Sequence, residues 1–457
     1  MVLKQIREKI LHVVSLSFFR SSVVYLSGNV LDAALPMLLL PVLTRYLTPT
    51  DYGIVATSTV LLQIFTVVLG LNAFGIISSS HFDHNEQSLQ RLVSTSILLA
   101  LILSGFLFLV ILPTSSVLES LTKFPASWTA VLVVVALSGV IQTTYLAIVQ
   151  ARGEPGKYVR LQIAATALNL ILSVLLVVSL GMDWRGRMLA IVATGVVMAM
   201  VSLYGLRFRL KLIRVDFDRG SLRSLLSFGI PLIPHFIGGW VMTMVARLYL
   251  NNMATVADTG LYSVGFNIAS PVALLVGAAN QAYVPALFSI LSNEKALNKL
   301  RLARLLLLGA LVLPMLAICY GLAVSLFVPL LVGSRFYGAS EYVLWLGLGF
   351  VIQGVYFIFG NFVVYSKRTS LMSWRADFLG GIVMMIACPL LIQLNGPLGA
   401  AQATALAFAV SCLGCFTASR IAFPMPWKEA LLSLVKPWSV SGSRNDPLHV
   451  TEKGIDR

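Results

Sequence analysis

The stretch "RFRLKLIRVDFDRGSLR" (residues 207–223) is the most basic segment of the chain, and it lies between two long hydrophobic regions. Six apolar segments precede it and six follow it. A helix of about 20 mostly apolar residues is long enough to cross a bilayer. We therefore predict an all-α polytopic membrane protein with about twelve transmembrane helices, arranged as two six-helix bundles joined by this linker.

The composition of the whole chain supports this class. Of the 457 residues, 58% are hydrophobic and 11% are charged, whereas about a quarter of the residues of a soluble protein are charged. The second and the eighth predicted spans are longer than a membrane requires, so we expect both to extend beyond it. The predicted spans are 21–43, 53–78, 92–112, 128–149, 161–180, 188–206, 225–246, 261–290, 302–326, 341–364, 374–393 and 398–419.

The spans divide the chain into five parts. Residues 1–20 are predicted to form an amphipathic N-terminus, and residues 421–457 a partly disordered tail. Residues 21–206 and 225–420 are the two bundles, and residues 207–224 are the basic linker between them.

The distribution of positive charge predicts the orientation in the membrane. Of the 33 Lys and Arg residues, 27 fall at the two termini or on every second connection, and the other side has 6. Because cytoplasmic loops of membrane proteins carry an excess of Lys and Arg, both termini are predicted to be cytoplasmic. The net charge of +15 is then a signal of topology with some attraction to anionic membrane lipids, and it requires no nucleic acid partner.

The connections between spans are too short for a soluble catalytic domain, which argues against an enzyme. Two short motifs have the side chains of a metal or redox site, namely "HFDH" (81–84) with Glu86, and Cys412 with Cys415. Neither has the further ligands that a zinc site needs. We therefore predict no metal and no cofactor.

The two halves of the chain repeat each other weakly. "LTRYLTPTDYGIV" (43–55) is echoed by "VARLYLNNMATVADTGLY" (245–262), so that Asp51 and Gly53 match Asp258 and Gly260 at a constant offset of 207 residues. Six spans per repeat place both halves the same way up, related by a pseudo-two-fold axis along the membrane normal. Such an arrangement suits alternating access between two bundles.

Three segments resemble the polysaccharide flippases of the multidrug/oligosaccharidyl-lipid/polysaccharide exporter superfamily. They are "LPMLLLPVLTRYLTPTDYGIVA" (35–56), "QARGEPGKYVRLQIAATALNLILSVLL" (150–176) and "NGPLGAAQATAL" (395–406). The resemblance covers residues 20–420 and implies two bundles around a central cavity. It also implies that the protein moves an undecaprenyl-pyrophosphate-linked oligosaccharide repeat unit from the cytoplasmic to the outer leaflet of the bacterial inner membrane, for O-antigen, other lipopolysaccharide or exopolysaccharide synthesis. Other polysaccharide assembly proteins are then possible partners.

Such a substrate makes simple chemical demands. Its lipid tail can stay among membrane lipids, whereas its sugars need a polar cavity and its pyrophosphate favours Arg. Arg45 and Arg247 end the first helix of each half on the outer side, and Arg152 lies on the inner side, so these three are candidates for binding the pyrophosphate. The alternative is that they snorkel to the membrane interface or pair with a nearby acid. Amides within the spans are candidates to line the cavity, or alternatively to bond between helices: Asn72, Asn169, Asn267, Asn280, Gln281 and Asn361.

Asp32 lies near the middle of the first apolar span, where a carboxylate costs about 2.5–3.5 kcal/mol. Asn29 shares its helix face, and the matching region of the second half contains His235 instead of an acid. A carboxyl group that titrates inside a cavity can couple transport to H⁺ or Na⁺. We therefore predict that these three residues contact the coupling ion or the substrate, the alternative being a neutral carboxyl bonded locally.

Prolines interrupt the first helix of each half. Each removes a backbone hydrogen bond and favours a kink, so Pro36, Pro41, Pro231 and Pro234 are predicted hinges, or alternatively fixed kinks. Three other functions remain open: a drug/cation antiporter of the same superfamily, a membrane oligosaccharide polymerase or glycosyltransferase, and a structural scaffold. The scarcity of acids within the spans argues against the first, and the short outer loops argue against the second.

Overall fold

The computed structural model describes residues 37–80, 86–213, 217–230, 233–292, 299–368, 371 and 373–435, and within these ranges the chain is helical with no β-strand. Ten of the described helices are long and apolar enough to cross a membrane. The predicted class, an all-α polytopic membrane protein, is thereby confirmed.

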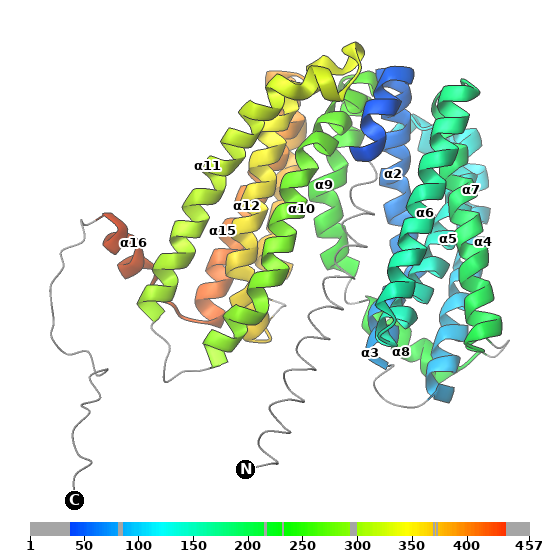
Figure 1. Ribbon diagram of the computed structural model, residues 1–457, viewed down its shortest axis with the longest axis horizontal. Coiled ribbons are helices and arrows are strands. Elements are labelled where there is room, and N and C mark those ends of the chain that lie inside the picture. Colours follow the sequence, from blue (N-terminus) through cyan, green and yellow to red (C-terminus); the bar gives the residue numbers. More distant parts are fainter. Residues whose placement is uncertain are drawn as a thin grey trace, which may run out of the picture.

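Two bundles make up the fold (Figure 1). The N-terminal bundle comprises α2 (Pro49–Gly70), α3 (Ala73–Ser80), α4 (Glu86–Thr122), α5 (Ala126–Ala151), α6 (Pro155–Val174) with the π-helical turn η2 (Leu175–Ser179), and α7 (Asp183–Tyr204) with the π-helical turn η3 (Gly205–Arg209). The C-terminal bundle comprises α9 (Ile233–Met253), α10 (Val256–Ser292), α11 (Lys299–Leu331), α12 (Ser340–Tyr365) after the 3-10 turn η5 (Ser334–Ala339), α14 (Leu379–Asn395) after the π-helical turn η6 (Ser373–Phe378), and α15 (Leu398–Ala422). Two short helices, α8 (Arg219–Gly229) and α16 (Trp427–Val435), follow the basic linker and α15 respectively.

The two remaining predicted spans are described in part. The first, at 21–43, is described only from Met37, where a short helix runs to Tyr46. The seventh, at 225–246, begins in α8 and continues in α9, and residues 231–232 between the two helices lie outside the described ranges.

The structure explains the unusual length of the predicted second span. Leu71 and Asn72 have left-handed backbone conformations, with φ of 42° and 53°, so the helix ends at Gly70 and α3 starts a new direction. The predicted third span, 92–112, is too short, because α4 continues as helix to Thr122. The hydroxyls of Thr114 and Ser120 there donate to the carbonyls of the preceding turn, which lets polar residues continue a helix beyond the apolar segment.

Each bundle has its own apolar core. In the N-terminal bundle α5 packs against α2, α4 and α7, and in the C-terminal bundle α12 packs against α10, α11 and α15. The helix α16 fixes part of the predicted tail on the C-terminal bundle, since the buried Trp427 ring packs edge-on against the rings of Phe359 and Phe362. The ribbon shows the bundles meeting at the end drawn at the top and diverging toward the other end (Figure 1).

The contact between bundles is made chiefly by α2 and α10. Both helices start in the same way, because Thr48 and Asp51 cap α2 by reciprocal hydrogen bonds and Thr255 and Asp258 do the same for α10. The two caps are 207 residues apart, the offset of the sequence repeat. The sequence repeat therefore relates the two helix starts, in α2 and α10, at which the bundles contact each other.

The outer end of the molecule, as assigned from the charge distribution, is sealed by hydrogen bonds from each bundle to the other. The Asn251 side chain of α9 donates to the Thr57 hydroxyl at 2.8 Å and to the Thr122 carbonyl at 2.7 Å. Asn252 donates to the Leu121 carbonyl at 2.7 Å. The Thr44 hydroxyl, in the short helix Met37–Tyr46, likewise accepts from the backbone N–H of Gly333 in the C-terminal bundle, at 3.1 Å. The first helix of each half thus reaches across to the other bundle.

Candidate functional site

A cavity of about 580 Å³ lies between the two bundles. The α2 segment from Leu62 to Val67 forms its N-terminal wall. The C-terminal wall comes from α9, α12, η6 and α15, through Phe236, Gly239, Trp240, Met242, Thr243, Gln353, Tyr356, Phe357, Asp377, Phe408 and Ser411. These residues lie in the middle of their helices and toward the end opposite the hydrogen-bonded outer end.

A second cavity, of about 500 Å³, continues the first into the N-terminal bundle. The two share Thr66, Val67 and Phe236 as lining residues, so they adjoin each other, and together they are called the hollow below. The second part is rich in amides and hydroxyls, contributed by Thr66, Asn72, Gln142, Thr143, Thr144, Tyr158 and Gln162. One wall of the hollow therefore offers hydrogen bonds, while the other is mainly aromatic.

The aromatic wall is held in place across the bundle boundary. The Trp240 indole of α9 donates to the Val60 carbonyl of α2 at 3.2 Å. Flat aromatic faces beside amides and hydroxyls suit sugars, because a sugar ring has both apolar faces and polar edges. Chemically, the hollow can therefore hold a carbohydrate headgroup.

Asp377 supplies a carboxyl group to the same cavity. It is buried, with 8% of its surface exposed, and lies in η6, where the helical repeat is widened. The Tyr356 hydroxyl donates to its Oδ1 at 3.0 Å. The sequence alone favours a local ion pair for Asp377 at the cytoplasmic edge, but its carboxyl group lines the central cavity. Of the carboxyl groups that the structure describes, it is the one that lines this hollow.

The structure does not place Arg45 and Arg247 in equivalent surroundings. Arg45 is exposed, and its Nη2 lies 3.5 Å from the Leu330 carbonyl. Arg247 is buried, with its guanidinium carbon 4.7 Å from the Phe266 ring centroid, and its Nη1 donates at 2.8 Å to the carbonyl of Thr243, a cavity residue. Arg247 thus lies next to the outer end of the cavity, away from Arg45.

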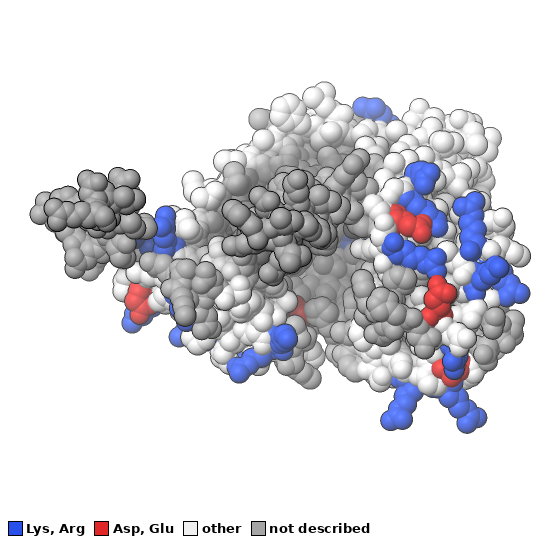
Figure 2. All heavy atoms as spheres, turned by 60° about the horizontal axis from the view of Figure 1, so that its bottom comes forward, with Lys and Arg blue, Asp and Glu red and all other residues white. Residues whose placement is uncertain are grey.

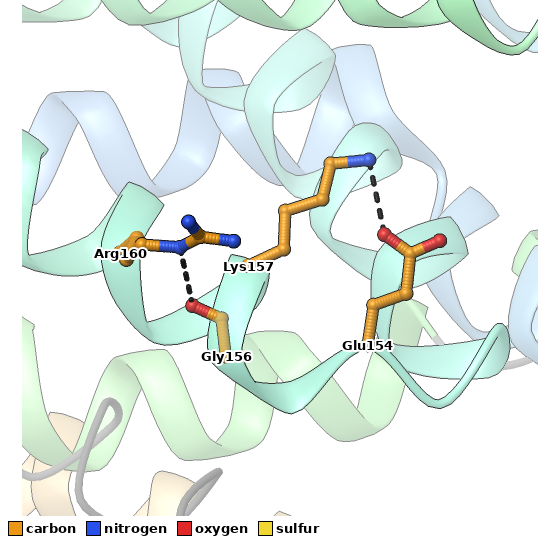
Figure 3. Close-up of polar contacts among 4 residues, drawn as sticks. All are labelled: Glu154, Gly156, Lys157 and Arg160. Carbon is orange, nitrogen blue, oxygen red and sulfur yellow. Dashed lines mark hydrogen bonds and ion pairs between the residues drawn. The ribbon is translucent and has the colours of Figure 1, made fainter.

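Arg152 lies at the cytoplasmic end of α5, and its Nε is buried without a hydrogen-bond partner among the described residues. The following turn adds further cations. Lys157 pairs with Glu154 at 3.1 Å, and the Arg160 Nε donates to the Gly156 carbonyl at 3.1 Å (Figure 3). Lys and Arg side chains gather over this end of the N-terminal bundle (Figure 2). The region is a basic rim close to Tyr158 and Gln162, which line the second cavity.

The predicted cavity amides have different surroundings. Asn72 lines the second cavity, Asn169 accepts a hydrogen bond from Arg187 at 2.6 Å, and Asn267 donates to the Tyr52 hydroxyl at 2.8 Å. Asn361 donates to Asn280 at 2.8 Å, beside a separate cavity of about 180 Å³ between α10, α11 and α12. Gln281 is exposed. The structure therefore brings Asn72 to the central hollow and gives most of the others partners on neighbouring helices.

Several predicted site residues lie outside the described residues, namely Asn29, Asp32, Pro36 and Pro231. Pro234 and His235 belong to the first turn of α9, where their side chains are not described. Pro41 lies within the short helix Met37–Tyr46 and is half-buried. Among the described residues no group of three or more His, Cys, Asp or Glu is arranged to hold a metal, and the "HFDH" motif (81–84) lies outside them.

Sequence reasoning missed Arg187, Tyr52 and Trp240. Arg187 is one of the six cations on the predicted outer side, before the sixth predicted span, but the structure buries it in the first turn of α7. One signal pointed to a buried partner: the polar residues of α6 recur at helical spacing, which places them on one face. They are Gln162, Thr166, Asn169 and Ser173, and all four are buried.

Comparisons with known proteins agree with this architecture. A family model described as a polysaccharide biosynthesis protein matches residues 42–341. Protein 1 of the Lsg locus of Haemophilus influenzae (strain KW20 Rd) is 25% identical over 364 residues, which cover 78% of this chain and 86% of the relative. An uncharacterised membrane protein of the same organism is 25% identical over 362 residues, covering 79% of this chain and 87% of that protein.

Solved structures show the same fold. The lipid II flippase MurJ in its inward closed conformation superposes with a TM-score of 0.67 at 13% identity, covering 92% of this chain and 89% of that one. A MATE family multidrug resistance transporter of the MOP superfamily in its inward-facing conformation gives 0.64 at 14% identity, covering 90% and 96%. An outward-facing conformation of such a transporter gives 0.51 at 15% identity, covering 92% and 97%. The present arrangement of the bundles is thus more similar to the inward-facing form.

Proposed function

We propose, since the chain belongs to the polysaccharide biosynthesis protein family, that this membrane transporter is a flippase for an undecaprenyl-pyrophosphate-linked oligosaccharide repeat unit. In this proposal it moves the lipid-linked sugar from the cytoplasmic to the outer leaflet of the bacterial inner membrane, for the synthesis of a surface polysaccharide. It acts as a transporter and not as an enzyme. The observation that carries the proposal is the pair of adjoining cavities at the bundle boundary, one rich in amides and hydroxyls and the other lined by several aromatic rings.

The shape of the hollow fits a substrate that is polar at one end only. The headgroup enters between the bundles, where Asn72, Gln142 and Gln162 offer hydrogen bonds and Trp240 offers an aromatic face. The lipid tail remains among membrane lipids, because transferring an apolar chain into a polar cavity has no favourable free energy. The basic rim at Arg152 and Lys157 attracts the anionic headgroup before it enters.

The sealed outer end gives the direction of access. With the bonds from Asn251 and Asn252 in place, the hollow lies on the cytoplasmic side of the seal when both termini are cytoplasmic. Breaking these bonds and closing the bundles at the other end opens the same site to the outer leaflet. This is alternating access by two repeats that rock around a fixed site.

The proposal includes coupling to H⁺ or Na⁺ through a carboxyl group. Asp377 supports it among the described residues, because it is buried and lines the cavity with the Tyr356 hydroxyl bound to it. Asp32 remains a second candidate from the sequence. Ionisable groups inside a membrane protein commonly mark ion or proton pathways.

The test is a lipid analysis of a strain that lacks this gene, by mass spectrometry of pyrophosphate-linked isoprenoids. We expect a complete oligosaccharide repeat unit to accumulate and to be protected from reagents added outside intact spheroplasts. The mass of this species also identifies the sugar. Complementation with the wild-type gene should remove the accumulated species, which shows that its build-up is due to the loss of this protein. Complementation with an Asp377→Asn variant should leave it in place if coupling depends on this carboxyl group.

Other outcomes reject the proposal. Accumulation of single repeat units that outside reagents do reach places the block after flipping, as for a missing polymerase. Unchanged lipids together with new sensitivity to cationic drugs indicates an antiporter. An unchanged lipid profile and unchanged drug sensitivity reject both transport functions.

A further inference from the structure

Two buried arginines lie on either side of the boundary between the bundles. Arg187 of α7 is 9% exposed and Arg247 of α9 is 4% exposed. Within the described part of the chain, neither guanidinium group is within ion-pair distance of a carboxylate; the ion pair found there joins Glu154 and Lys157. Each bundle therefore holds one buried positive charge near the sealed outer end.

Arg187 is held by the polar face of α6. Its Nη1 donates to Asn169 Oδ1 and to Ser173 Oγ, both at 2.6 Å. The same face continues toward the second cavity through Thr166 to Gln162, which lines it. The Thr166 hydroxyl is buried and has no hydrogen-bond partner among the described residues. A buried polar path thus leads from the cavity to Arg187.

Arg247 is held by neutral groups of the C-terminal bundle. Its Nε donates to the Ser263 hydroxyl at 3.1 Å, and its Nη1 donates to the Thr243 carbonyl at 2.8 Å. The Phe266 and Tyr262 rings lie against the guanidinium, with centroids 4.7 Å and 5.6 Å from its central carbon. Because Thr243 lines the central cavity, Arg247 is the cation nearest to its outer end in this wall.

Helix α2, which carries Tyr52, packs against both α7 and α9, the helices that carry the two arginines. The Tyr52 hydroxyl accepts a hydrogen bond from Asn267 of α10 at 2.8 Å, which joins the two bundles at this point. Separation of α2 from α10 breaks this bond and exposes the space between the arginines.

Neutral hydrogen bonds compensate only partly for burying a charge away from water, and an uncompensated buried ion is costly. Two such cations facing one boundary make a site of strong positive potential. A diphosphate matches it, because each phosphate group can accept two parallel hydrogen bonds from one guanidinium.

We propose that Arg187 and Arg247 form an anion site, split between the two bundles, for the diphosphate of the lipid-linked substrate. The proposal rests on the proposed function and adds the residues that recognise the phosphates. In the present conformation the Tyr52–Asn267 bond closes the site, and Arg247 is reached first from the cavity. Opening of the outer side brings both arginines into contact with the diphosphate.

The test measures binding of three lipid probes to the full-length protein in nanodiscs by native mass spectrometry. The probes are undecaprenyl pyrophosphate, undecaprenyl phosphate and undecaprenol. We expect the wild type to prefer the diphosphate to the alcohol, and Arg187→Met and Arg247→Met to lose this preference at least tenfold. Lys at either position should restore part of it, since the charge returns without the bidentate geometry. Arg185→Gln is the matched control, because Arg185 is exposed and lies beside Trp184, two residues before Arg187.

Thermal stability separates binding from a structural role. Each Met variant removes a buried charge but leaves the acceptors of Asn169 or Thr243 unpaired, at a cost of about 1–3 kcal/mol, so we expect only a moderate fall in melting temperature. Inorganic pyrophosphate should compete with the lipid probe if the phosphates alone are recognised.

Two results would overturn the inference and leave the proposed function intact. One is that the Met variants keep the wild-type preference for undecaprenyl pyrophosphate over undecaprenol. The other is that they lose all lipid binding together with a large fall in melting temperature, with no rescue by Lys. Failure of the wild type to bind or flip any lipid-linked oligosaccharide would instead reject the proposed function itself.

Discussion

Gly53 of α2 and Gly260 of α10 occupy equivalent positions in the two bundles. Each lies directly against a backbone carbonyl of the opposite helix. A Cβ atom on Gly53 would overlap the Val256 carbonyl oxygen, and one on Gly260 would overlap the Pro49 carbonyl oxygen. Pro49 and Val256 are themselves 207 residues apart. The closest approach of α2 and α10 therefore lies on the pseudo-two-fold axis and forms the outer seal.

The first prediction concerns this seal. Gly260→Ala should shift the protein away from the present conformation, because overpacking of a tight contact typically costs about 1–3 kcal/mol, equivalent to about a 5- to 150-fold change in the equilibrium. The measurement is the rate at which a membrane-impermeant maleimide, added to the cytoplasmic side, alkylates a single cysteine placed at Gln63, in the cavity. The four native cysteines are replaced in this variant. This rate should fall.

Gly277→Ala provides the control for this experiment. Gly277 lies in the same helix, but a Cβ atom there meets nothing within 4 Å, so its labelling rate should match that of the parent. Equal rates for Gly260→Ala and Gly277→Ala would show that the glycine contact does not govern access.

The second prediction concerns the hydrogen bond between Tyr52 and Asn267. Removing it with Tyr52→Phe should favour the outward-open state, and a double-mutant cycle with Asn267→Ala should give a coupling free energy of about 0.5–1.5 kcal/mol. The populations can be measured by the distance distribution between spin labels on the two bundles. Tyr320→Phe is the matched control, because the Tyr320 hydroxyl donates to the Ile268 carbonyl within the C-terminal bundle. A coupling free energy of zero would mean that the other hydrogen bonds between the bundles, from Asn251 and Asn252, keep the outer side closed.

The third prediction tests Asp377 as the coupling group. Asp377→Asn keeps a hydrogen-bond acceptor for Tyr356 and removes the ionisable group, so the fold should survive while gradient-driven flipping in proteoliposomes falls at least tenfold. Glu341→Gln is the control, because Glu341 is exposed in the first turn of α12. If Asp377→Asn responds to imposed H⁺ and Na⁺ gradients as the wild type does, coupling depends on another group.

The fourth prediction concerns the N-terminus of α8. The Ser221 hydroxyl and backbone N–H both donate to Asp218 at 2.7 Å, and these bonds lower the pKa of the Asp218 carboxyl from its ordinary value. Since the pKa is lower in the folded state, the capping contribution is present above the ordinary Asp pKa of about 3.9 and is lost as the pH falls through the lowered value.

Hydrogen exchange of the first α8 amides, corrected for intrinsic rates, measures this effect. Protection should be constant at neutral pH and should decline under strong acid in the wild type. Asp218→Asn should show little of this decline, because a neutral amide can still accept at the cap. The same acid dependence in both proteins would mean that another group controls this helix end.

Sequence alone determined the class and the repeat, and it predicts the orientation in the membrane. Apolar length and the bias of Lys and Arg are sufficient for these, because the membrane imposes helix length and orientation independently of packing. The repeat matched Asp51 with Asp258, and the structure adds that both are capping residues, a local feature of the chain.

Only the tertiary structure decided which polar side chains meet. Arg45 and Arg247 occupy similar places in the repeat, yet one is exposed and the other is buried against aromatic rings. From sequence, Arg187 is interpreted as a loop cation, but in the structure it is bonded to Asn169 of α6. Asp377 is interpreted as a residue at the membrane edge, but in the structure it lines a cavity together with residues of α9, α12 and α15. Burial and partners depend on rotation and packing of helices far apart in the chain, and hydrophobic periodicity does not encode these in segments that are apolar on every face.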